Sequence, residues 1–137
     1  MDIELIVKNV RPLLPEALKK KLPETVAVVL IDAKTSARLN LIYREKRKST
    51  NVLSFYYDAT YGELLICAAV VKAEAKAQGN SYEYQMTWMI VHGMLHLAGV
   101  HHEKSEAMEE KAERIESVIL KKLVKSSEER LVIRGKK

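Results

Sequence analysis

The stretch YQMTWMIVHGMLHLAGVHH, residues 84–102, decides the fold, because it is long, rich in apolar residues and free of Asp, Glu, Lys and Arg. Its length is close to what a bilayer crossing requires. It also contains all four histidines of the chain, together with Gln85 and Thr87. Polar side chains at this density are costly in lipid, but they suit a helix packed inside a globular domain. We therefore predict a helix at the centre of the protein and no membrane span.

Sequence signals mark both ends of this central helix. Asn80, followed three residues later by Glu83, is a capping-box-like start, and Gly99 can end the helix. The sequence therefore predicts a helix from Asn80 to about Ala98, with two of the histidines inside it.

Strand and helix patterns fill the chain on both sides of this helix. Period-two alternation or dense β-branched and aromatic residues predict strands at residues 2–7, Thr25–Ile31, Val52–Tyr57 and Leu64–Ile66. Helical spacing of apolar residues predicts helices over Pro12–Lys21, Ser36–Arg44, Ala68–Gln78 and Ser105–Val124. The first of the Val-rich runs, Thr25–Ile31, suits a strand covered on both faces, and the turn-prone residues 58–62 predict that their flanking strands pair. No repeat or linker interrupts the order, so residues 1–137 are assigned to one domain.

The composition is that of a globular protein, with 137 residues of which 47% are hydrophobic and 30% charged. Cys67 is the single cysteine and can form no disulfide within the chain, and the first residues lack the pattern of a secretory signal. We therefore expect a reducing, cytoplasmic compartment. The net charge of +5 favours an anionic partner such as nucleic acid.

The histidines form a metal-binding pattern. His92 and His96 are four residues apart, so in a helix both imidazoles lie on one face about one turn apart. After a turn at Gly99, His102 can supply a third nitrogen from another direction. A lone histidine on an apolar face is usually a hydrogen-bonded core residue, but four histidines within eleven residues favour a metal site.

Three imidazole ligands leave one position of a tetrahedral ion open, which is typical of catalytic rather than structural zinc. We expect one divalent metal ion, in the first place zinc, with nickel or another transition metal as alternatives. His101 is the weaker ligand candidate. Spacing alone does not separate adjacent residues, so the set in which His101 replaces His102 stays open.

The frame H-x-x-x-H-x-x-G-x-x-H also occurs in metzincin proteases, which carry a Glu directly after the first histidine. In this chain Gly93 occupies that position. Because the Glu is the general base for peptide hydrolysis, its absence argues against a protease while it leaves the metal frame intact.

The run HGMLHLAGVHH, residues 92–102, resembles the signature H-G-x-L-H-L-x-G-[YF]-D-H of the YbeY-like endoribonucleases. Upstream, LNLIYR at 39–44 and TNVLSF at 50–55 are similar to that family's L-N-x-x-[YF]-R and T-[DN]-V-L-S-F. GELLI at 62–66 stands where the family has G-D-[IL]-x-I. These separated motifs occur in the family's order over about residues 39–108.

The resemblance implies an α+β domain with a small mixed sheet packed by helices. It implies single-strand-specific endoribonuclease activity in ribosomal RNA maturation and ribosome quality control, with single-stranded ribosomal RNA as partner and ribosomal proteins or ribosome-associated factors as further candidates. By matching position, the metal ligands are His92, His96 and His102, and Arg44 is the basic residue of the active-site cleft.

The chain departs from the family pattern beside the last histidine. His101 replaces the family's Asp, which removes a possible carboxylate near the metal, and Val100 replaces an aromatic residue. Glu63 keeps the charge of the family's Asp on a longer side chain. No general base stands out, although Glu63 or His101 could serve.

Arg44 suits the stabilisation of charge on phosphorus, because a guanidinium can contact two phosphoryl oxygens at once. The alternative role of Arg44 is that of a surface residue in an ion pair. Lys46, Arg47 and Lys48 follow closely and predict a solvated basic face that can track RNA phosphates. Two other functions stay open: a nonenzymatic ribosome-associated RNA-binding factor with a structural metal, and a metalloprotease.

Overall fold

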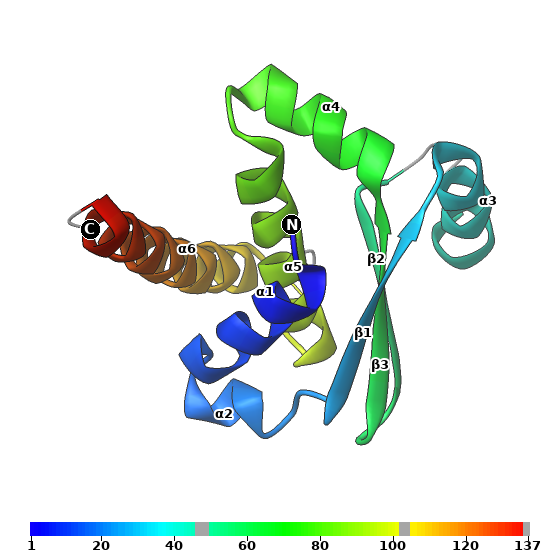
Figure 1. Cartoon of the computed structure of the whole chain (residues 1–137). Helices are drawn as coiled ribbons and strands as arrows, with labels where there is room; N and C mark the ends of the chain where they lie inside the picture. The colour runs from blue at the N-terminus through cyan, green and yellow to red at the C-terminus, as the bar shows by residue number, and fades with distance from the viewer. Residues whose placement is uncertain (46–49, 102–104, 136–137) are drawn as a thin grey trace.

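The computed structural model describes residues 1–45, 50–101 and 105–135, with side chains described as far as residue 124. Its strands are β1 (Thr25–Ile31), β2 (Val52–Asp58) and β3 (Tyr61–Cys67). Its helices are α1 (Ile3–Val10), the 3-10 turn η1 (Arg11–Leu13), α2 (Glu16–Lys19), α3 (Ala33–Arg44), α4 (Ala68–Gln78), α5 (Tyr82–Leu97) and α6 (Glu106–Gly135). Figure 1 shows the helices packed around one sheet, which confirms the predicted α+β fold.

The sheet is mixed and its strand order is β1-β3-β2. β2 and β3 form an antiparallel hairpin, as predicted, and β1 joins β3 in parallel. The prediction that β1 is covered on both faces is wrong, because Val29 and Leu30 are both exposed. A strand at the edge of a three-stranded sheet has a neighbour on one side only, and the surrounding helices leave part of it open.

The first predicted strand is a helix. Residues 2–7 alternate at Ile3, Leu5 and Val7, but the structure forms α1, whose N-terminal cap is the Asp2 side chain accepting from the Leu5 N–H at 3.0 Å. Residues 3, 6, 7 and 10 also follow helical spacing, and Val7 and Val10 are the buried members. Leu5, the residue on which the strand pattern depends, remains exposed.

The helix predicted over Pro12–Lys21 is broken into η1 and α2. Leu14 has an extended conformation, with ψ of 147°. Pro15 follows it, and a proline disfavours helical geometry in the residue before it. The break therefore has a local steric cause, which the helical spacing of the apolar residues does not reveal.

The predicted central helix is confirmed as α5. Its N-cap is Ser81, whose hydroxyl accepts from the Tyr84 N–H at 3.1 Å. The capping box predicted at Asn80 is wrong by one residue, because the Asn80 side chain instead donates to Gln85. Nine residues of α5 are buried, and among them Met86, Ile90 and Met94 are fully so.

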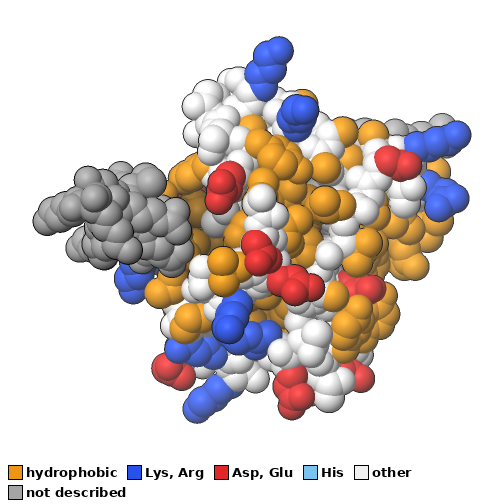
Figure 2. Space-filling view, viewed as in Figure 1, with side chains coloured by type: hydrophobic (Ala, Val, Ile, Leu, Met, Phe, Trp, Pro, Cys, Tyr) orange, Lys and Arg blue, Asp and Glu red, His pale blue; other side chains and the backbone are white. Residues whose placement is uncertain are grey.

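Helices cover the two faces of the sheet unequally. α1, α5 and α6 lie on one side and α3 lies on the other (Figure 1). In the space-filling view, hydrophobic side chains remain visible on the side where α3 and the β2–β3 hairpin lie (Figure 2). Within the residues that the structure describes, no helix combines the length and apolar character needed to cross a bilayer.

Candidate active site in a cleft beside strand β2

A cleft of about 530 Å³ runs beside β2, between the C-terminal end of α3 and the histidine-bearing face of α5. Arg44, His92, His96 and His101 line it together with residues 50–55. The structure thus brings three of the four predicted site residues into one cleft. The fourth, His102, lies outside the described residues.

His92 and His96 lie one helical turn apart on α5, as their spacing predicted. Their ring centroids are 5.9 Å apart and the ring planes are inclined by 41°. The His101 ring packs edge-on against His96, with a centroid distance of 4.8 Å and an angle of 87°. Three imidazoles of the described residues therefore lie next to one another at the cleft.

The turn at Gly99 returns the chain toward the cleft. Gly99 has a φ of +90°, a left-handed conformation that glycine adopts readily. The Gly99 N–H donates to the His96 carbonyl at 3.0 Å, and the Val100 N–H donates to the Leu95 carbonyl at 2.9 Å. This Schellman-type ending satisfies the last carbonyls of α5 and directs His101 back against His96.

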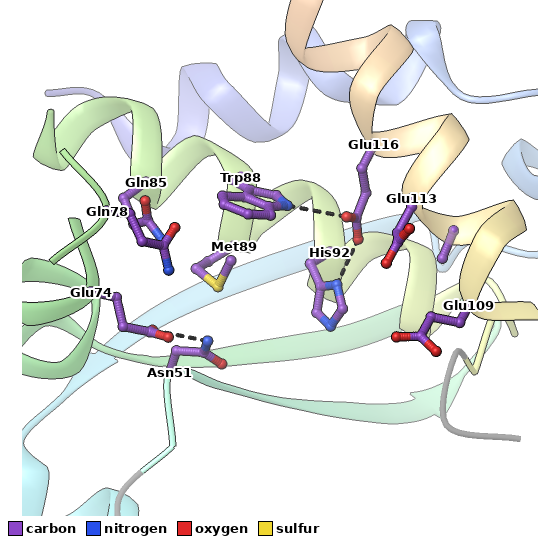
Figure 3. A pocket seen from close by; sticks show the side chains of 11 residues that line it. Asn51, Glu74, Gln78, Gln85, Trp88, Met89, His92, Glu109, Glu113 and Glu116 are labelled. Carbon is purple, nitrogen blue, oxygen red and sulfur yellow. Dashed lines mark hydrogen bonds and ion pairs between the residues drawn. The ribbon is translucent and has the colours of Figure 1, made fainter. Parts of the chain in front are cut away.

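A buried carboxylate on α6 orients His92. Glu116 Oε1 lies 2.6 Å from His92 Nδ1, and Glu116 Oε2 accepts from Trp88 Nε1 at 3.1 Å (Figure 3). The Glu116 side chain is only 8% exposed. Because Nδ1 faces Glu116, the opposite edge of the ring carries Nε2. A carboxylate in this position fixes the tautomer and orientation of a metal-ligating histidine.

Sequence reasoning missed Glu116, although a signal for it was present. Glu116 lies at helical spacing from apolar residues of the helix predicted over Ser105–Val124, four residues after Ala112 and three before Ile119. An acidic residue on a buried stripe needs a polar partner, since an unpaired buried charge is costly. The identity of that partner depends on how α6 packs on α5, which the local pattern does not contain.

A smaller cavity of about 250 Å³ adjoins the cleft and shares Asn51 and His92 with it. Carboxylates of Glu109 and Glu113 on α6 are among its lining groups (Figure 3). Together with Glu116 they place negative charge on the α6 side of His92. This negative charge attracts cations to that side of the cavity.

The TNVLSF motif holds the rim of the cleft. The Ser36 hydroxyl on α3 donates to the Thr50 carbonyl at 2.9 Å and accepts from the Thr50 N–H at 3.0 Å. Asn51 Nδ2 donates to Glu74 Oε1 at 3.0 Å, and Asn51 Oδ1 accepts from the Val52 N–H at 2.7 Å. These bonds fasten the start of β2 to α3 and α4.

Glu63 does not face the histidines. Its neighbours on β3, Gly62 and Leu64, pack toward α5, so the alternation of a strand turns Glu63 to the opposite face. There Glu63 accepts hydrogen bonds from the hydroxyls of Tyr57 at 2.8 Å and Tyr61 at 2.9 Å. These bonds raise the pKa of both tyrosines above 10.0. The suggestion that Glu63 serves as general base is therefore not supported.

A comparison with protein families identifies the chain. The family model for endoribonuclease YbeY matches residues 2–124. The chain belongs to the YbeY endoribonuclease family. A solved relative in fold is the solution structure of TM1509 from Thermotoga maritima, with a TM-score of 0.59 and 26% sequence identity over 92% of this chain and 89% of TM1509. The resemblance drawn from the histidine run and the upstream motifs is thereby confirmed.

The glycine of the YbeY histidine run has a packing reason. A Cβ at Gly93 would lie 2.7 Å from Leu64 Cδ2 on β3, closer than two carbons can approach. The Ser54 hydroxyl also donates to the Gly93 carbonyl, at 3.4 Å. The position that carries the catalytic Glu in metzincins is thus pressed onto the sheet, and a side chain there would have to displace Leu64.

The described part of this YbeY-family site fits two positions of a metal centre. The donors are imidazoles, which suit zinc, nickel and similar ions. Within residues 1–45, 50–101 and 105–124, no set of three His, Cys, Asp or Glu side chains converges in the manner of a complete metal site. A complete three-histidine site would need His102, which lies outside these ranges, or a rearranged His101.

Proposed function

We propose that this YbeY-family chain is a metal-dependent, single-strand-specific endoribonuclease that acts in ribosomal RNA maturation and ribosome quality control. The observation that supports it best is the placement of Arg44 in one cleft with His92 and His96. One cleft therefore contains an arginine, which suits phosphate binding, and two histidines, which suit metal binding.

His92 and His96 would hold the ion, with His102 as third ligand and His101 as the alternative. From the His92 ring the ligating atom would be Nε2, since Nδ1 faces Glu116. Zinc is the first choice, and nickel or another transition metal also suits imidazole. When bound, such an ion supplies Lewis-acid chemistry, since it polarises a phosphoryl oxygen and makes water more acidic.

The chain's own residues bind and orient the RNA. Arg44 is exposed at the end of α3, so its guanidinium can contact two oxygens of the scissile phosphate. Negative charge grows on these oxygens during attack on phosphorus, and a cation positioned beforehand stabilises it without rearrangement. The rim at Thr50 and Asn51 is fixed by hydrogen bonds, so it can serve as a rigid wall against which the strand lies.

The expected partner is single-stranded RNA, in the first place ribosomal RNA, with ribosomal proteins or ribosome-associated factors as further partners. The net charge of +5 supports an RNA partner through phosphate neutralisation. Lys46, Arg47 and Lys48, which we expect to contribute to this attraction, lie outside the described residues.

The proposal is tested by metal analysis combined with RNA cleavage. Protein purified without a nickel column should retain about one divalent ion per chain, and His96→Ala should lose it. His101→Ala and His102→Ala, measured side by side, decide which residue is the third ligand. The same protein should cleave a single-stranded RNA and spare the matching duplex.

Chelation separates the enzyme from its rivals. Removal of the metal should abolish RNA cleavage while circular dichroism keeps its helical signal. If chelation instead unfolds the chain, the metal is structural and the RNA-binding factor is the better description. Cleavage of an unfolded protein substrate in the same assay would support a protease. Stoichiometric metal in His96→Ala would contradict the ligand assignment.

A further inference from the structure

Four aromatic rings gather on the sheet face turned away from α5. On β2, Phe55 pairs with Glu63 across the hairpin, and the Tyr57 hydroxyl donates to the Glu63 carboxylate at 2.8 Å, so both rings lie on the face of Glu63. Tyr61 on β3 lies beside Tyr57, with ring centroids 5.7 Å apart and planes inclined by 34°. From α3, Tyr43 packs edge-on against Phe55 with centroids 5.0 Å apart. The two pairs of rings follow one another from the cleft toward the end of the hairpin, and together we call them the aromatic face.

The aromatic face is open to solvent. Tyr43 is 62% exposed, Tyr57 60% and Tyr61 36%. In Figure 2, hydrophobic side chains gather on the side of the molecule where α3 and the β2–β3 hairpin lie. A contiguous group of exposed rings is unusual on a folded protein and marks a surface that contacts a partner.

Glu63 holds two of these rings in place from one edge. Its two carboxylate oxygens each accept one phenolic hydroxyl, from Tyr57 and from Tyr61. Both tyrosines are thus anchored at their tips, which lowers the entropy cost of using them as contact surfaces. The negative charge of Glu63 lies within hydrogen-bond distance of both hydroxyls.

The aromatic face continues directly into the cleft. Tyr43 and Phe55 line the cleft together with Arg44 and the histidines, and Tyr43 precedes Arg44 in the sequence. If one phosphate of an RNA strand lies at Arg44, the bases that follow it therefore lie beside the aromatic rings. Exposed aromatic rings next to a group that binds phosphate, here Arg44, are the arrangement with which sheets bind single-stranded nucleic acid, because every base has a face that can stack.

We propose that the aromatic face binds the bases of single-stranded RNA that extend beyond the cleft, by stacking on Tyr43, Tyr57 and Tyr61. This inference rests on the proposed function and deepens it, because it explains a requirement for an unpaired strand. In a duplex the base faces are covered by their neighbours and cannot stack on the protein. The face gives affinity for any sequence, whereas the chemistry stays at Arg44 and the histidines.

The test compares RNAs of two lengths. A short single-stranded RNA that fills only the cleft and a longer one that extends past it are measured by fluorescence anisotropy and by steady-state cleavage. The variants are Tyr57→Ala, Tyr61→Ala and their combination. Tyr57→Phe keeps the ring and loses the hydroxyl, and Val118→Ala, which shortens an exposed apolar side chain on α6, is the matched control.

Each alanine variant should weaken binding of the long RNA about 5- to 150-fold, as expected for the loss of one stacked base. The KM for the long RNA should rise with kcat unchanged, because the ring binds substrate and transition state equally. Binding and cleavage of the short RNA should not change. Tyr57→Phe should retain most of the affinity, and Val118→Ala all of it.

The inference is overturned if the double variant binds the long RNA as the wild type does while circular dichroism shows both to be folded. It is also overturned if the substitutions alter self-association in sedimentation but leave RNA affinity unchanged, since the face would then bind a second copy. If the wild type binds the long RNA through these tyrosines but cleaves no RNA, the proposed catalysis fails and the aromatic face stands.

Discussion

Replacement of Gly93 by alanine should destabilise the fold, although alanine is the better helix former. The new Cβ would lie 2.7 Å from Leu64 Cδ2 and 3.0 Å from Leu64 Cδ1. Carbon atoms pack best at about 3.5–4.0 Å, so helix α5 or the Leu64 side chain must move by about 1 Å. Leu64 is fully buried on the central strand of the sheet, which limits how far it can retreat.

Two opposing effects set the magnitude. The exchange of glycine for alanine inside a helix gains about 1 kcal/mol in the free energy of unfolding. Overpacking in a well-filled core costs about 1–3 kcal/mol. At a contact this short we place the cost at the upper end, which leaves a net loss of about 1–2 kcal/mol. For a chain of this size the melting temperature should fall by about 4 °C for each kcal/mol.

Urea unfolding followed by circular dichroism measures this loss, and a double-mutant cycle identifies its cause. Leu64→Ala alone should cost about 2–5 kcal/mol because it opens a cavity. In the double variant the alanine at 93 can use that space, so the combined loss should be smaller than the sum by about 1 kcal/mol or more.

The reasoning about this contact is refuted if Gly93→Ala is as stable as the wild type or more so. It is also refuted if the two losses add. Either result would mean that α5 and β3 accommodate a methyl group without strain, and that the glycine serves another purpose.

Three further outcomes are expected. Glu116→Gln should weaken zinc binding by about 10- to 100-fold in competition with a chromophoric chelator, because His92 loses its orienting carboxylate; unchanged affinity would remove Glu116 from the site. Arg44→Ala should keep its fold and metal but slow single-turnover cleavage at saturating RNA by about 100-fold or more, with partial recovery in Arg44→Lys; a near-normal alanine variant would return Arg44 to a surface role. Glu63→Gln should lower the pKa of Tyr57 and Tyr61 toward 10.0 in a phenolate absorbance titration, since the hydrogen bonds to the Glu63 carboxylate raise both values. The wild-type stability that these tyrosines contribute is complete below the unfolded pKa and is lost as the pH rises through the raised values, so the variant should show a smaller alkaline loss.

Much of the fold was predictable wherever one local signal dominated. The strand Thr25–Ile31 and the helix Ala68–Gln78 have the bounds that their patterns predict. The central position of α5 followed from a run of residues without Asp, Glu, Lys or Arg, because such a helix must be buried. Periodicity failed at residues 2–7, where strand and helix patterns coincide and only packing decides between them.

The candidate site was predictable only in its local part. The helical spacing of His92 and His96 places both on one face regardless of the rest of the fold. The pairing of His92 with Glu116 joins residues 24 positions apart, and it exists only because α6 crosses α5 at that level. The position of Glu63 was misjudged for a similar reason, since the face to which a strand residue points depends on the register of the whole hairpin.

The two halves of the cleft are held by different contacts, so they can be disturbed separately. The imidazoles of His92 and His96 belong to α5, which is seated on β3 at Gly93 and backed by Glu116. Arg44 ends α3 on the other side of the sheet, and α3 is tied to the rim of β2 through Ser36 and Thr50. The proposed metal-binding and phosphate-binding groups therefore depend on packing on opposite faces of the sheet. They meet only because β2 is an edge strand, past which side chains from both faces reach the same cleft.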